Sequence, residues 1–382
     1  MEQLVGPSDK KRSGQLVVLI AIIINVVLAE LILDYVFPQP VYPIKYSRWG
    51  WEHIPNISFG FVPESKESKS FVEYNSDGFR GSDEYAIPTP PDTFRVAILG
   101  DSYAEGSAVD YSYLNGKILE DLLGAHLSAG EYNGYKKAEV IKAGVYSYEP
   151  CQFLRLFDAR VKKYKPKVVF VLHTTKYAAD NYCKIGQNGI VYNDLSFSRF
   201  EYYSRYLLNY IRAKSQLVNY VWRLYRYKFG EGIHLPEKFN QEMFTYEPVK
   251  IDINRDKEID KEQSLARYTR GFQGQEGEMP TEASRRLMRA VYRTLDDLVT
   301  EYGGQLRIVI THASKKNETL AGDLEQMSIQ YFNLASYLGD YQKQDIDFEL
   351  GGHWNEYGHN LVGKGLFQIV KELELPDLIP SI

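Results

Sequence analysis

The sequence has few cysteines and no excess of basic residues. Only Cys151 and Cys183 occur among 382 residues, which excludes a small disulfide-dense scaffold. In an exported protein the two could form one disulfide, and the sequence leaves open whether they pair. With 45 Lys and Arg against 50 Asp and Glu, the net charge is −5. The basic excess typical of nucleic-acid-binding proteins is missing, so we expect no nucleic-acid partner.

Motifs for metal ions and phosphate cofactors are missing as well. The residues His173, His312, His353 and His359 do not fall into the close spacing of metal ligands. No Gly-rich phosphate loop of the GxxxxGK type occurs. We therefore expect neither a metal nor a cofactor. The hydrophobic share of 44% and the charged share of 25% are ordinary for a globular protein and exclude disorder along the whole chain.

A long apolar run lies near the N-terminus. Residues 16–37 read LVVLIAIIINVVLAELILDYVF, and about 20 apolar residues are needed to cross a bilayer. Basic residues occupy positions 10–12, and the next one downstream is Lys45. The positive-inside rule then predicts a cytoplasmic tail at 1–15, a single-pass transmembrane helix, and a periplasmic or extracellular main domain within 38–382. A cleaved signal peptide is the alternative; we favour the uncleaved anchor.

Three polar side chains interrupt this apolar run. Asp34 is close enough to its end to reach the membrane interface, whereas Asn25 and Glu30 lie deeper, where polar groups usually face protein. We therefore predict that the helix contacts a partner membrane protein. A self-dimer, or a tilted helix that holds Glu30 among the headgroups, is the alternative.

The rest of the chain alternates short apolar strands with helical patterns. Continuous β-branched runs indicate strands buried on both faces, as in a parallel sheet. They are found at residues 94–100, 139–144, 167–173, 306–311 and 331–335. Helical patterns lie between them at 113–127, 152–163 and 281–302. We predict an α/β fold, a three-layer α/β/α sandwich around a parallel, flavodoxin-like sheet.

The predicted sheet belongs to one elaborated domain at 94–382. A Pro-rich stalk and approach segment precedes it at 38–93, and an insertion at about 181–280 enlarges it. Within the insertion, 202–228 is basic, has no acid and carries apolar residues near helical spacing. This pattern predicts either a helix on an anionic membrane surface or a helix packed on the core with a solvated basic face. The polar stretch 231–278 is predicted to be a mobile lid or partly disordered.

Two motifs carry the candidate chemistry. GDSYAEG at 100–106 follows the first predicted strand directly, which puts Ser102 where nucleophiles are found in α/β enzymes. Taken alone, the motif is also typical of a turn with a helix cap. Near the C-terminus, GGHWNEYGHNLVGKGL at 351–366 puts His353 just before an amphipathic helix. From there the imidazole can reach the strand ends and accept the Ser102 proton as a general base.

This pair of motifs resembles the SGNH (GDSL-type) hydrolase family, which includes esterases and O-acyltransferases. The resemblance covers about residues 94–372 and takes in the segments NSDGFRG and AGVYSYEPCQFL, which look like those of membrane-anchored bacterial members. It implies a three-layer α/β/α fold with Ser102 as nucleophile and His353 as general base. It also implies that the backbone N–H groups of Ser102 and Gly144 bind the oxyanion.

The sequence departs from the family pattern in two places. The position of the third oxyanion donor, normally an Asn, corresponds to Thr175 or Lys176. The triad acid is not two or three residues before the catalytic His; Asp347 is the chosen candidate, with Glu349 and Asp345 nearby. A Ser–His dyad without an acid is the alternative.

Two classes of function follow from these motifs. The first is a membrane-anchored, exported serine esterase or O-acyltransferase that acts on acyl esters, expected to be acetyl, of an envelope glycan or of an acylated small molecule. The second is a catalytically impaired subunit or scaffold of a membrane protein complex, motivated by the two departures. Carbohydrate binding without turnover is a third and weaker possibility.

Overall fold

The computed structural model describes most of the chain and divides it into two compact units. The described residues are 7–63, 65–129, 134–174, 177–178, 182–187, 189–194, 198–229, 279–312, 314–339, 343–349 and 352–373. The anchor unit comprises residues 1–43 and 207–247, and the sheet unit comprises 44–206 and 248–382. The predicted lid at 231–278 lies outside the described residues.

A five-stranded parallel sheet forms the centre of the sheet unit. Its strands are β5 (Thr93–Gly100), β6 (Lys137–Gly144), β7 (Val168–His173), β10 (Gln305–Ile310) and β11 (Tyr331–Asn333). In space they follow the order β6-β5-β7-β10-β11, and every pairing is parallel. Numbered along the chain this is 2-1-3-4-5, the flavodoxin-like order. The predicted α/β fold class is confirmed, and each of the five predicted strands is present.

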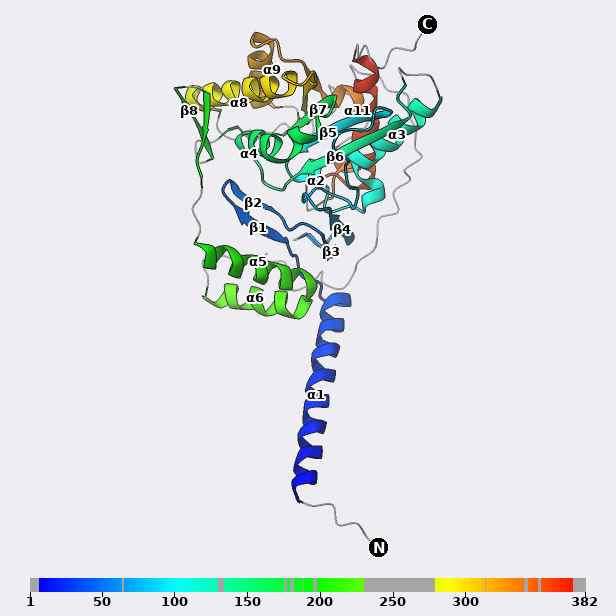
Figure 1. Cartoon of the computed structure of the whole chain (residues 1–382), viewed down its shortest axis with the longest axis vertical. Helices are drawn as coiled ribbons and strands as arrows, with labels where there is room; N and C mark the ends of the chain where they lie inside the picture. The colour runs from blue at the N-terminus through cyan, green and yellow to red at the C-terminus, as the bar shows by residue number, and fades with distance from the viewer. Residues whose placement is uncertain are drawn as a thin grey trace. The chain divides into compact units, whose positions relative to one another are not determined.

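Helices cover both faces of this sheet, as Figure 1 shows with α4 and α8 on one side and α3 and α11 on the other. The longer helices are α3 (Asn115–Ala129), α4 (Pro150–Leu156), α8 (Glu282–Thr300), α9 (Lys315–Gln326) and α11 (Glu356–Glu372). Shorter helical turns are α2 (Ser102–Glu105), η1 (Tyr111–Tyr113), η2 (Phe157–Val161), η3 (Lys162–Tyr164), η5 (Leu334–Tyr337) and α10 (Lys343–Ile346). The result is the predicted three-layer arrangement.

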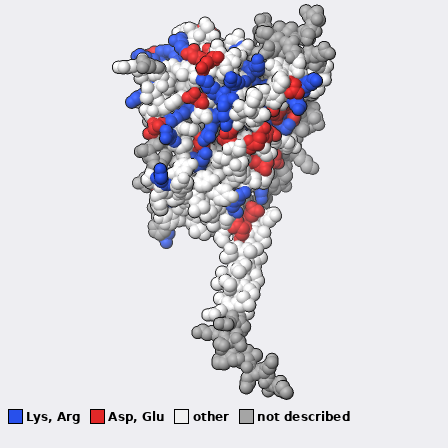
Figure 2. Space-filling model, viewed as in Figure 1, with Lys and Arg blue, Asp and Glu red and all other residues white. Residues whose placement is uncertain are grey.

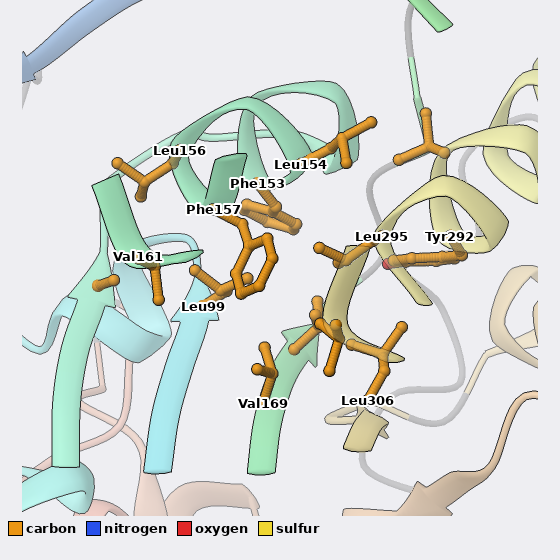
Figure 3. Packing of buried hydrophobic residues seen from close by; sticks show 14 of the residues in the cluster. Leu99, Phe153, Leu154, Leu156, Phe157, Val161, Val169, Tyr292, Leu295 and Leu306 are labelled. Carbon is orange, nitrogen blue, oxygen red and sulfur yellow. The ribbon is translucent and has the colours of Figure 1, made fainter. Parts of the chain in front are cut away.

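The strand side chains alternate between two hydrophobic cores. Ala97 and Leu99 of β5 join the core beneath α4 and α8, whereas Val96 and Ile98 join the core beneath α3 and α11. Figure 3 shows the first of these cores, in which Leu99 meets side chains of α4, η2 and α8. Because both faces of the strands are buried, β5 is a continuous apolar run, as the sequence indicated.

The approach segment before β5 is folded into the sheet unit. It forms the antiparallel hairpins β1 (Ile44–Ser47) with β2 (Gly50–His53), and β3 (Ile57–Phe61) with β4 (Ser70–Tyr74). Ile54, Ile57 and Val72 are at most 2% exposed. Residues of these strands point alternately inward and outward, so their apolar residues do not form a continuous run. The sequence analysis therefore did not predict these strands.

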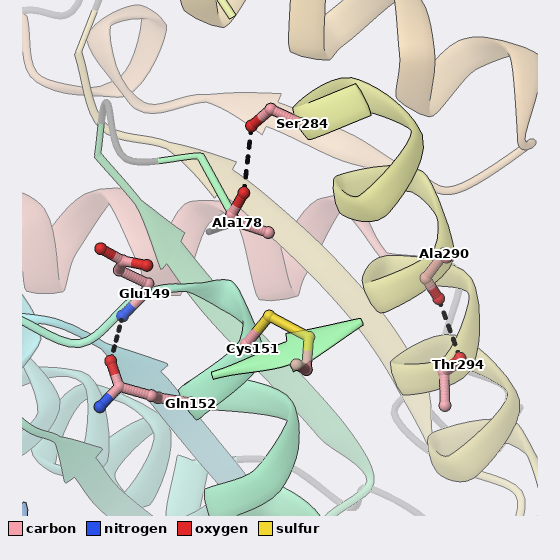
Figure 4. Close-up of a disulfide and its surroundings, with 8 residues drawn as sticks. Glu149, Cys151, Gln152, Ala178, Ser284, Ala290 and Thr294 are labelled. Carbon is pink, nitrogen blue, oxygen red and sulfur yellow. Dashed lines mark hydrogen bonds between the residues drawn. A yellow bond between two sulfur atoms is a disulfide. The ribbon is translucent and has the colours of Figure 1, made fainter. Parts of the chain in front are cut away.

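A disulfide joins Cys151 at the start of α4 to Cys183 (Figure 4). Cys183 opens the hairpin of β8 (Cys183–Gly186) and β9 (Gly189–Tyr192). Both sulfur-bearing residues are fully buried. The pairing that the sequence left open is therefore present, and it holds the first part of the insertion against α4.

The anchor unit contains the apolar helix α1 (Pro7–Tyr35). Its stretch Gly14–Tyr35 has a mean hydropathy of 3.0 and is long and apolar enough to cross a membrane. Figure 2 shows it as a white surface, largely without charged groups. We expected the Pro-rich segment after this helix to form a stalk in solvent. Its first part is instead folded into the unit, since Gln39, Pro40 and Val41 are buried.

The basic stretch of the insertion forms two helices, α5 (Arg199–Lys214) and α6 (Gln216–Phe229), where the sequence suggested one. Ser215 separates them, and its hydroxyl accepts a hydrogen bond from Val218 N at 3.1 Å. This is the bond of a helix N-cap, so a new helix begins at this position.

Candidate active site

Ser102 lies at the carboxyl end of β5, next to the point where the strand order reverses. Gly100 ends the strand, Asp101 caps the helix, and Ser102 is the first residue of α2. The Asp101 carboxylate accepts hydrogen bonds from Tyr103 N at 3.1 Å and from Thr174 Oγ1 at 2.9 Å. The turn that presents Ser102 is thereby fixed to the segment that follows β7, the neighbouring strand. Such a crevice at the strand ends is where doubly wound folds bind ligands.

His353 meets Ser102 across 251 residues of sequence. The Ser102 Oγ and the His353 Nε2 are 2.8 Å apart, within the range that a nucleophile and its general base require. His353 is only partly buried, and Asn355 behind it caps α11 by accepting a hydrogen bond from Gly358 N at 2.9 Å. The structure thus brings the two motif residues together in the geometry of a serine nucleophile with its base.

Tyr103 holds the loop that carries His353, a role the sequence analysis did not assign. Its ring stacks on the His353 ring with centroids 5.0 Å apart. Its hydroxyl donates a hydrogen bond to the Gly352 carbonyl at 2.6 Å. Burial, together with the nearby charges of Asp347 and Asp101, raises the pKa of this phenol, so it remains a donor at neutral pH. The signal was present in the sequence, since Tyr103 directly follows Ser102 in GDSYAEG.

Asp347 is the buried member of the three candidate acids. It is 6% exposed, whereas Asp345 and Glu349 are exposed. Asp347 pairs with Trp354 in an antiparallel bridge, and Phe348 N donates to the His353 carbonyl at 2.8 Å. The loop between Asp347 and Trp354 therefore folds back, and Asp347 lies close to His353 although they are six positions apart in the sequence.

The predicted oxyanion donors lie at one edge of the sheet. Gly144 ends β6 and is paired with Gly100, the last residue of β5. A Cβ atom on Gly144 would be 2.2 Å from the Glu105 nitrogen, so the Gly144 backbone packs directly on α2, the helix of Ser102. The third predicted donor position, Thr175 or Lys176, lies outside the described residues.

Glu105, three residues after Ser102, is the centre of a buried polar network that the sequence analysis missed. Its carboxylate accepts hydrogen bonds from Tyr74 Oη at 2.7 Å, Ser107 Oγ at 2.5 Å and Tyr146 N at 2.6 Å. His53 Nε2 lies 3.2 Å from the same carboxylate. Burial raises the pKa of Glu105, but His53 and the hydrogen bonds outweigh it and hold that pKa below its usual value.

His359 supports the site from behind rather than taking part in it. It is 2% exposed, and its Nδ1 accepts a weak hydrogen bond from Asn115 N at 3.4 Å. Burial, with smaller contributions from His353 and Arg80, lowers its pKa to about 3. It is therefore neutral at physiological pH. Among the residues that the structure describes, no group of three His, Cys, Asp or Glu side chains could hold a metal ion.

Comparisons with known proteins find similar chains among the solved structures only. No protein-family model matches the sequence, and no curated protein matches it. The structure is similar to TesA, with a TM-score of 0.35 and 10% identity over 73% of this chain and 98% of that one. It is similar to a putative lipolytic protein of the G-D-S-L family from Desulfitobacterium hafniense, with a TM-score of 0.36 and 9% identity over 72% and 99% of the two chains. A catalytic mutant of an acetylxylan esterase from Geobacillus stearothermophilus gives 0.35 and 9% over 75% and 97%.

Proposed function

We propose that this protein is a serine acyl-transfer enzyme of the SGNH type, an esterase or an O-acyltransferase. The observation that carries the proposal is the 2.8 Å contact between Ser102 Oγ and His353 Nε2 at the carboxyl end of the central strand. A structural serine would satisfy its hydroxyl locally, for example by capping α2, but Asp101 already performs that task. The Ser102 side chain is directed instead to a His from the other end of the chain.

In the proposed reaction, Ser102 Oγ attacks the carbonyl carbon of an ester while its proton passes to His353 Nε2. The tetrahedral oxyanion is bound by the backbone N–H groups of Ser102 and Gly144. When the intermediate collapses, His353 returns the proton to the departing alcohol and the acyl group stays on Ser102. Water or an acceptor hydroxyl then attacks the acyl-enzyme by the same steps in reverse. Asp347 is proposed to orient the His353 ring.

A groove in the sheet unit supports a glycan as the substrate. It has a volume of about 670 Å³ and is lined by basic and aromatic side chains with two acids: Lys45, Tyr46, Ser47, Arg48, Trp49, Glu52, Arg160, Asp194, Arg199, Tyr202 and Tyr203. Tyr and Trp rings offer flat apolar faces with a polar edge, which suits the stacking of sugar rings. The groove is large enough for several sugar units, within the usual range of ligand pockets.

The charges of the groove favour an acidic glycan. Glu52 is bound by both Lys45, at 3.0 Å, and Arg160, at 3.4 Å. Asp194 pairs with Arg155, which is not part of the lining. Arg48 and Arg199 are exposed and make no ion pair among the described residues. The groove therefore has an excess of positive charge that a carboxylated or phosphorylated glycan would neutralise.

Hydrogen bonds from the β1–β2 hairpin connect the groove to α2, the helix of Ser102. Trp49 Nε1 donates to Tyr148 Oη at 3.0 Å, and Trp51 Nε1 donates to the Tyr146 carbonyl at 3.1 Å. Tyr146 N in turn donates to Glu105 of α2. We propose that the groove holds the polymer while Ser102 handles the acyl group.

The proposal is tested by labelling the full-length chain with a fluorophosphonate, which reacts with activated serines. The wild type is expected to be labelled at Ser102, and Ser102→Ala is expected to abolish labelling. Ser128→Ala, an exposed serine on α3, is the matched control and should label normally. His353→Gln should slow labelling at least about a hundredfold, since the base is removed. Wild-type protein that is folded and unlabelled would refute the enzyme proposal.

The role of Asp347 is separated from that of the dyad by Asp347→Asn. If the acid orients His353, this change should lower the rate by up to about four orders of magnitude. An unchanged rate would indicate a Ser–His dyad.

The groove is tested by Arg48→Gln, which should weaken turnover of an acetylated acidic glycan and leave turnover of a small aryl acetate unchanged. Equal loss on both substrates would contradict the groove's role.

We further propose that α1 is an uncleaved single-pass anchor, with the N-terminus cytoplasmic and the sheet unit periplasmic or extracellular. The size of the mature chain in membranes, compared with that of the full translated sequence, tests this. A partner membrane protein remains a prediction, although Asn25 and Glu30, which motivated it, both have acceptors or donors within the chain. A catalytically impaired scaffold is the alternative that an unreactive Ser102 would favour.

A further inference from the structure

The second half of α5, from Leu207, and α6 form a helical hairpin in the anchor unit. Ser215 alone separates α5 from α6. Arg212 of α5 donates from Nε to Asn219 Oδ1 of α6 at 3.1 Å, and its guanidinium lies over the Trp222 ring at 5.7 Å. These contacts connect the second half of α5 to α6. The hairpin is therefore a defined structure rather than two independent helices.

The hairpin is fastened to the apolar helix α1 through Glu30. The Glu30 carboxylate accepts hydrogen bonds from Ser215 Oγ at 2.8 Å, Gln216 N at 2.5 Å and Leu217 N at 3.1 Å. The N–H groups at the start of α6 would otherwise lack acceptors, since a helix cannot satisfy its own first N–H groups. Glu30 is five residues from the end of α1 at Tyr35, so the start of α6 is held beside the last turns of the apolar run.

The segment that follows α1 binds the inner side of α6. The side chain of Asn219, fully buried, donates to the carbonyls of Gln39 at 3.3 Å and Pro40 at 3.1 Å. Gln39 N donates to Gln216 Oε1 at 2.9 Å. Asn219, the residue of α6 that is fully buried among those described, is thus polar.

The outward faces of both helices are apolar, which inverts the usual arrangement. In α6, Val221, Leu224 and Tyr225 are between 49% and 56% exposed. The corresponding positions of α5, Leu207, Tyr210 and Ile211, are between 38% and 56% exposed. In each helix these residues have the spacing i, i+3, i+4, which is one face of a helix. A surface helix of a soluble protein would turn this face to the core.

A lysine follows each apolar triplet at position i+7. Lys214 completes the α5 face and Lys228 the α6 face, and both are exposed. Lysine can bury its aliphatic stem while its ammonium group reaches water or a phosphate. No acid occurs from residue 202 to 229, whereas six basic residues do. They are Arg205, Arg212, Lys214, Arg223, Arg226 and Lys228.

We infer that the α5–α6 hairpin lies flat on an anionic phospholipid surface, with the two apolar triplets inserted at the boundary between headgroups and acyl chains. The combination of an exposed apolar face, flanking basic residues and attachment to the end of a candidate membrane helix is that of an interfacial amphipathic hairpin. This inference does not depend on the catalytic proposal. It gives Glu30 a role, since its carboxylate holds the hairpin at the level of the interface.

The test uses the full-length chain in lipid nanodiscs, with a reporter on the proposed buried face. Both native cysteines are in the disulfide and no free thiol exists, so a single introduced cysteine can be labelled with the fluorophore NBD. Leu224→Cys reports on α6 and Ile211→Cys on α5. Lys371→Cys, on the exposed end of α11, is the matched control. Quenching is measured with a lipid that carries a doxyl group near its headgroup, and separately with aqueous iodide.

In discs containing one-third phosphatidylglycerol, doxyl lipid should quench the two hairpin probes at least about threefold more than the control, and iodide should quench them less. Because each basic residue near an anionic surface strengthens association about fivefold, replacing phosphatidylglycerol with phosphatidylcholine should reduce the difference. Lys228→Gln combined with Arg226→Gln should do the same. Intact far-ultraviolet circular dichroism excludes unfolding as the cause.

Two results would overturn the inference. If iodide reaches the hairpin probes as readily as the control in anionic discs, the face is solvated. If the probes are shielded from iodide without quenching by doxyl lipid, and only in discs that hold two chains, the face binds a second copy. Both results leave fluorophosphonate labelling of Ser102 unaffected, so they are independent of the proposed function.

Discussion

The hydrogen bonds to the buried Glu105 carboxylate lead to a prediction about stability. In Glu105→Gln, the size of the side chain is retained but one acceptor oxygen becomes an NH₂ group. Three neighbours donate hydrogen bonds to the carboxylate, namely Tyr74 Oη, Ser107 Oγ and Tyr146 N. Because Tyr146 N can only donate, the amide oxygen must face it, and the new NH₂ group then replaces the charged oxygen that accepted from Tyr74 and Ser107.

The expected loss follows from these contacts. A hydrogen bond to a charged group contributes about 1.5–3 kcal/mol, and a buried donor left without an acceptor costs about 1–3 kcal/mol. We expect Glu105→Gln to lower the free energy of unfolding by about 2–3 kcal/mol. The wild-type Glu105 has a lowered pKa, so its contribution is present above the unfolded pKa near 4.3 and is lost as the pH falls through the folded pKa.

Urea unfolding of the full-length chain in detergent, followed by near-ultraviolet circular dichroism, measures this loss. Glu301→Gln is the matched control, because Glu301 pairs with Lys162 on the surface and its side chain is 64% exposed. The control should change the free energy of unfolding by less than about 1 kcal/mol. A loss below 1 kcal/mol for Glu105→Gln as well would refute the idea that this network fastens the approach segment to α2.

Three further predictions concern the site and its surroundings. Gly144→Ala would place a Cβ atom 2.2 Å from the Glu105 nitrogen, so α2 must move, and fluorophosphonate labelling should fall at least about tenfold while the fold survives. Replacing Cys151 and Cys183 with alanine opens a loop of 32 residues and should cost about 3–4 kcal/mol, measured as a lower urea midpoint. His359 has a pKa of about 3 in the folded chain and about 6.5 unfolded, so stability should decline from pH 6.5 towards 3, by about 2 kcal/mol at pH 5. His359→Gln should remove this contribution, while His173, whose pKa burial also lowers to about 3, keeps its own. An unchanged pH profile of the urea midpoint in His359→Gln would contradict the assignment.

The sheet could be predicted because its strands are buried on both faces. The five apolar runs were visible without any knowledge of the structure, and the strand order follows the flavodoxin-like arrangement. The motif pair was visible for a similar reason: Ser102 follows a strand and His353 precedes a helix, so topology brings them to one edge. The approach hairpins were missed, since half-buried strands of four or five residues leave little periodic signal.

The polar contacts could not be predicted, because nothing local encodes them. Glu30 accepts a hydrogen bond from Ser215, which is 185 positions away in the sequence. From the sequence alone, we had expected Glu30 to face a helix of another protein. The Asp347 backbone pairs with Trp354, next to His353, because the loop between Asp347 and Trp354 folds back. The resemblance had implied an acid two or three residues before His353. Two glycines in that loop hinted at a turn, but the register of the bridge depends on tertiary contacts.

Glu30 and Glu105 stabilise the fold in the same way, as buried or half-buried carboxylates that accept several hydrogen bonds. Each is a carboxylate, which only accepts, and each collects donors from segments far apart in sequence. Glu105 binds the approach segment through Tyr74 and contacts it through His53, so that segment is part of what positions α2 and Ser102. A fragment beginning at residue 94, the start of the domain by sequence, would leave the buried Glu105 carboxylate without two of its partners. The part of this protein able to hold Ser102 in place therefore begins with the β1–β2 hairpin, some fifty residues before the first strand of the sheet.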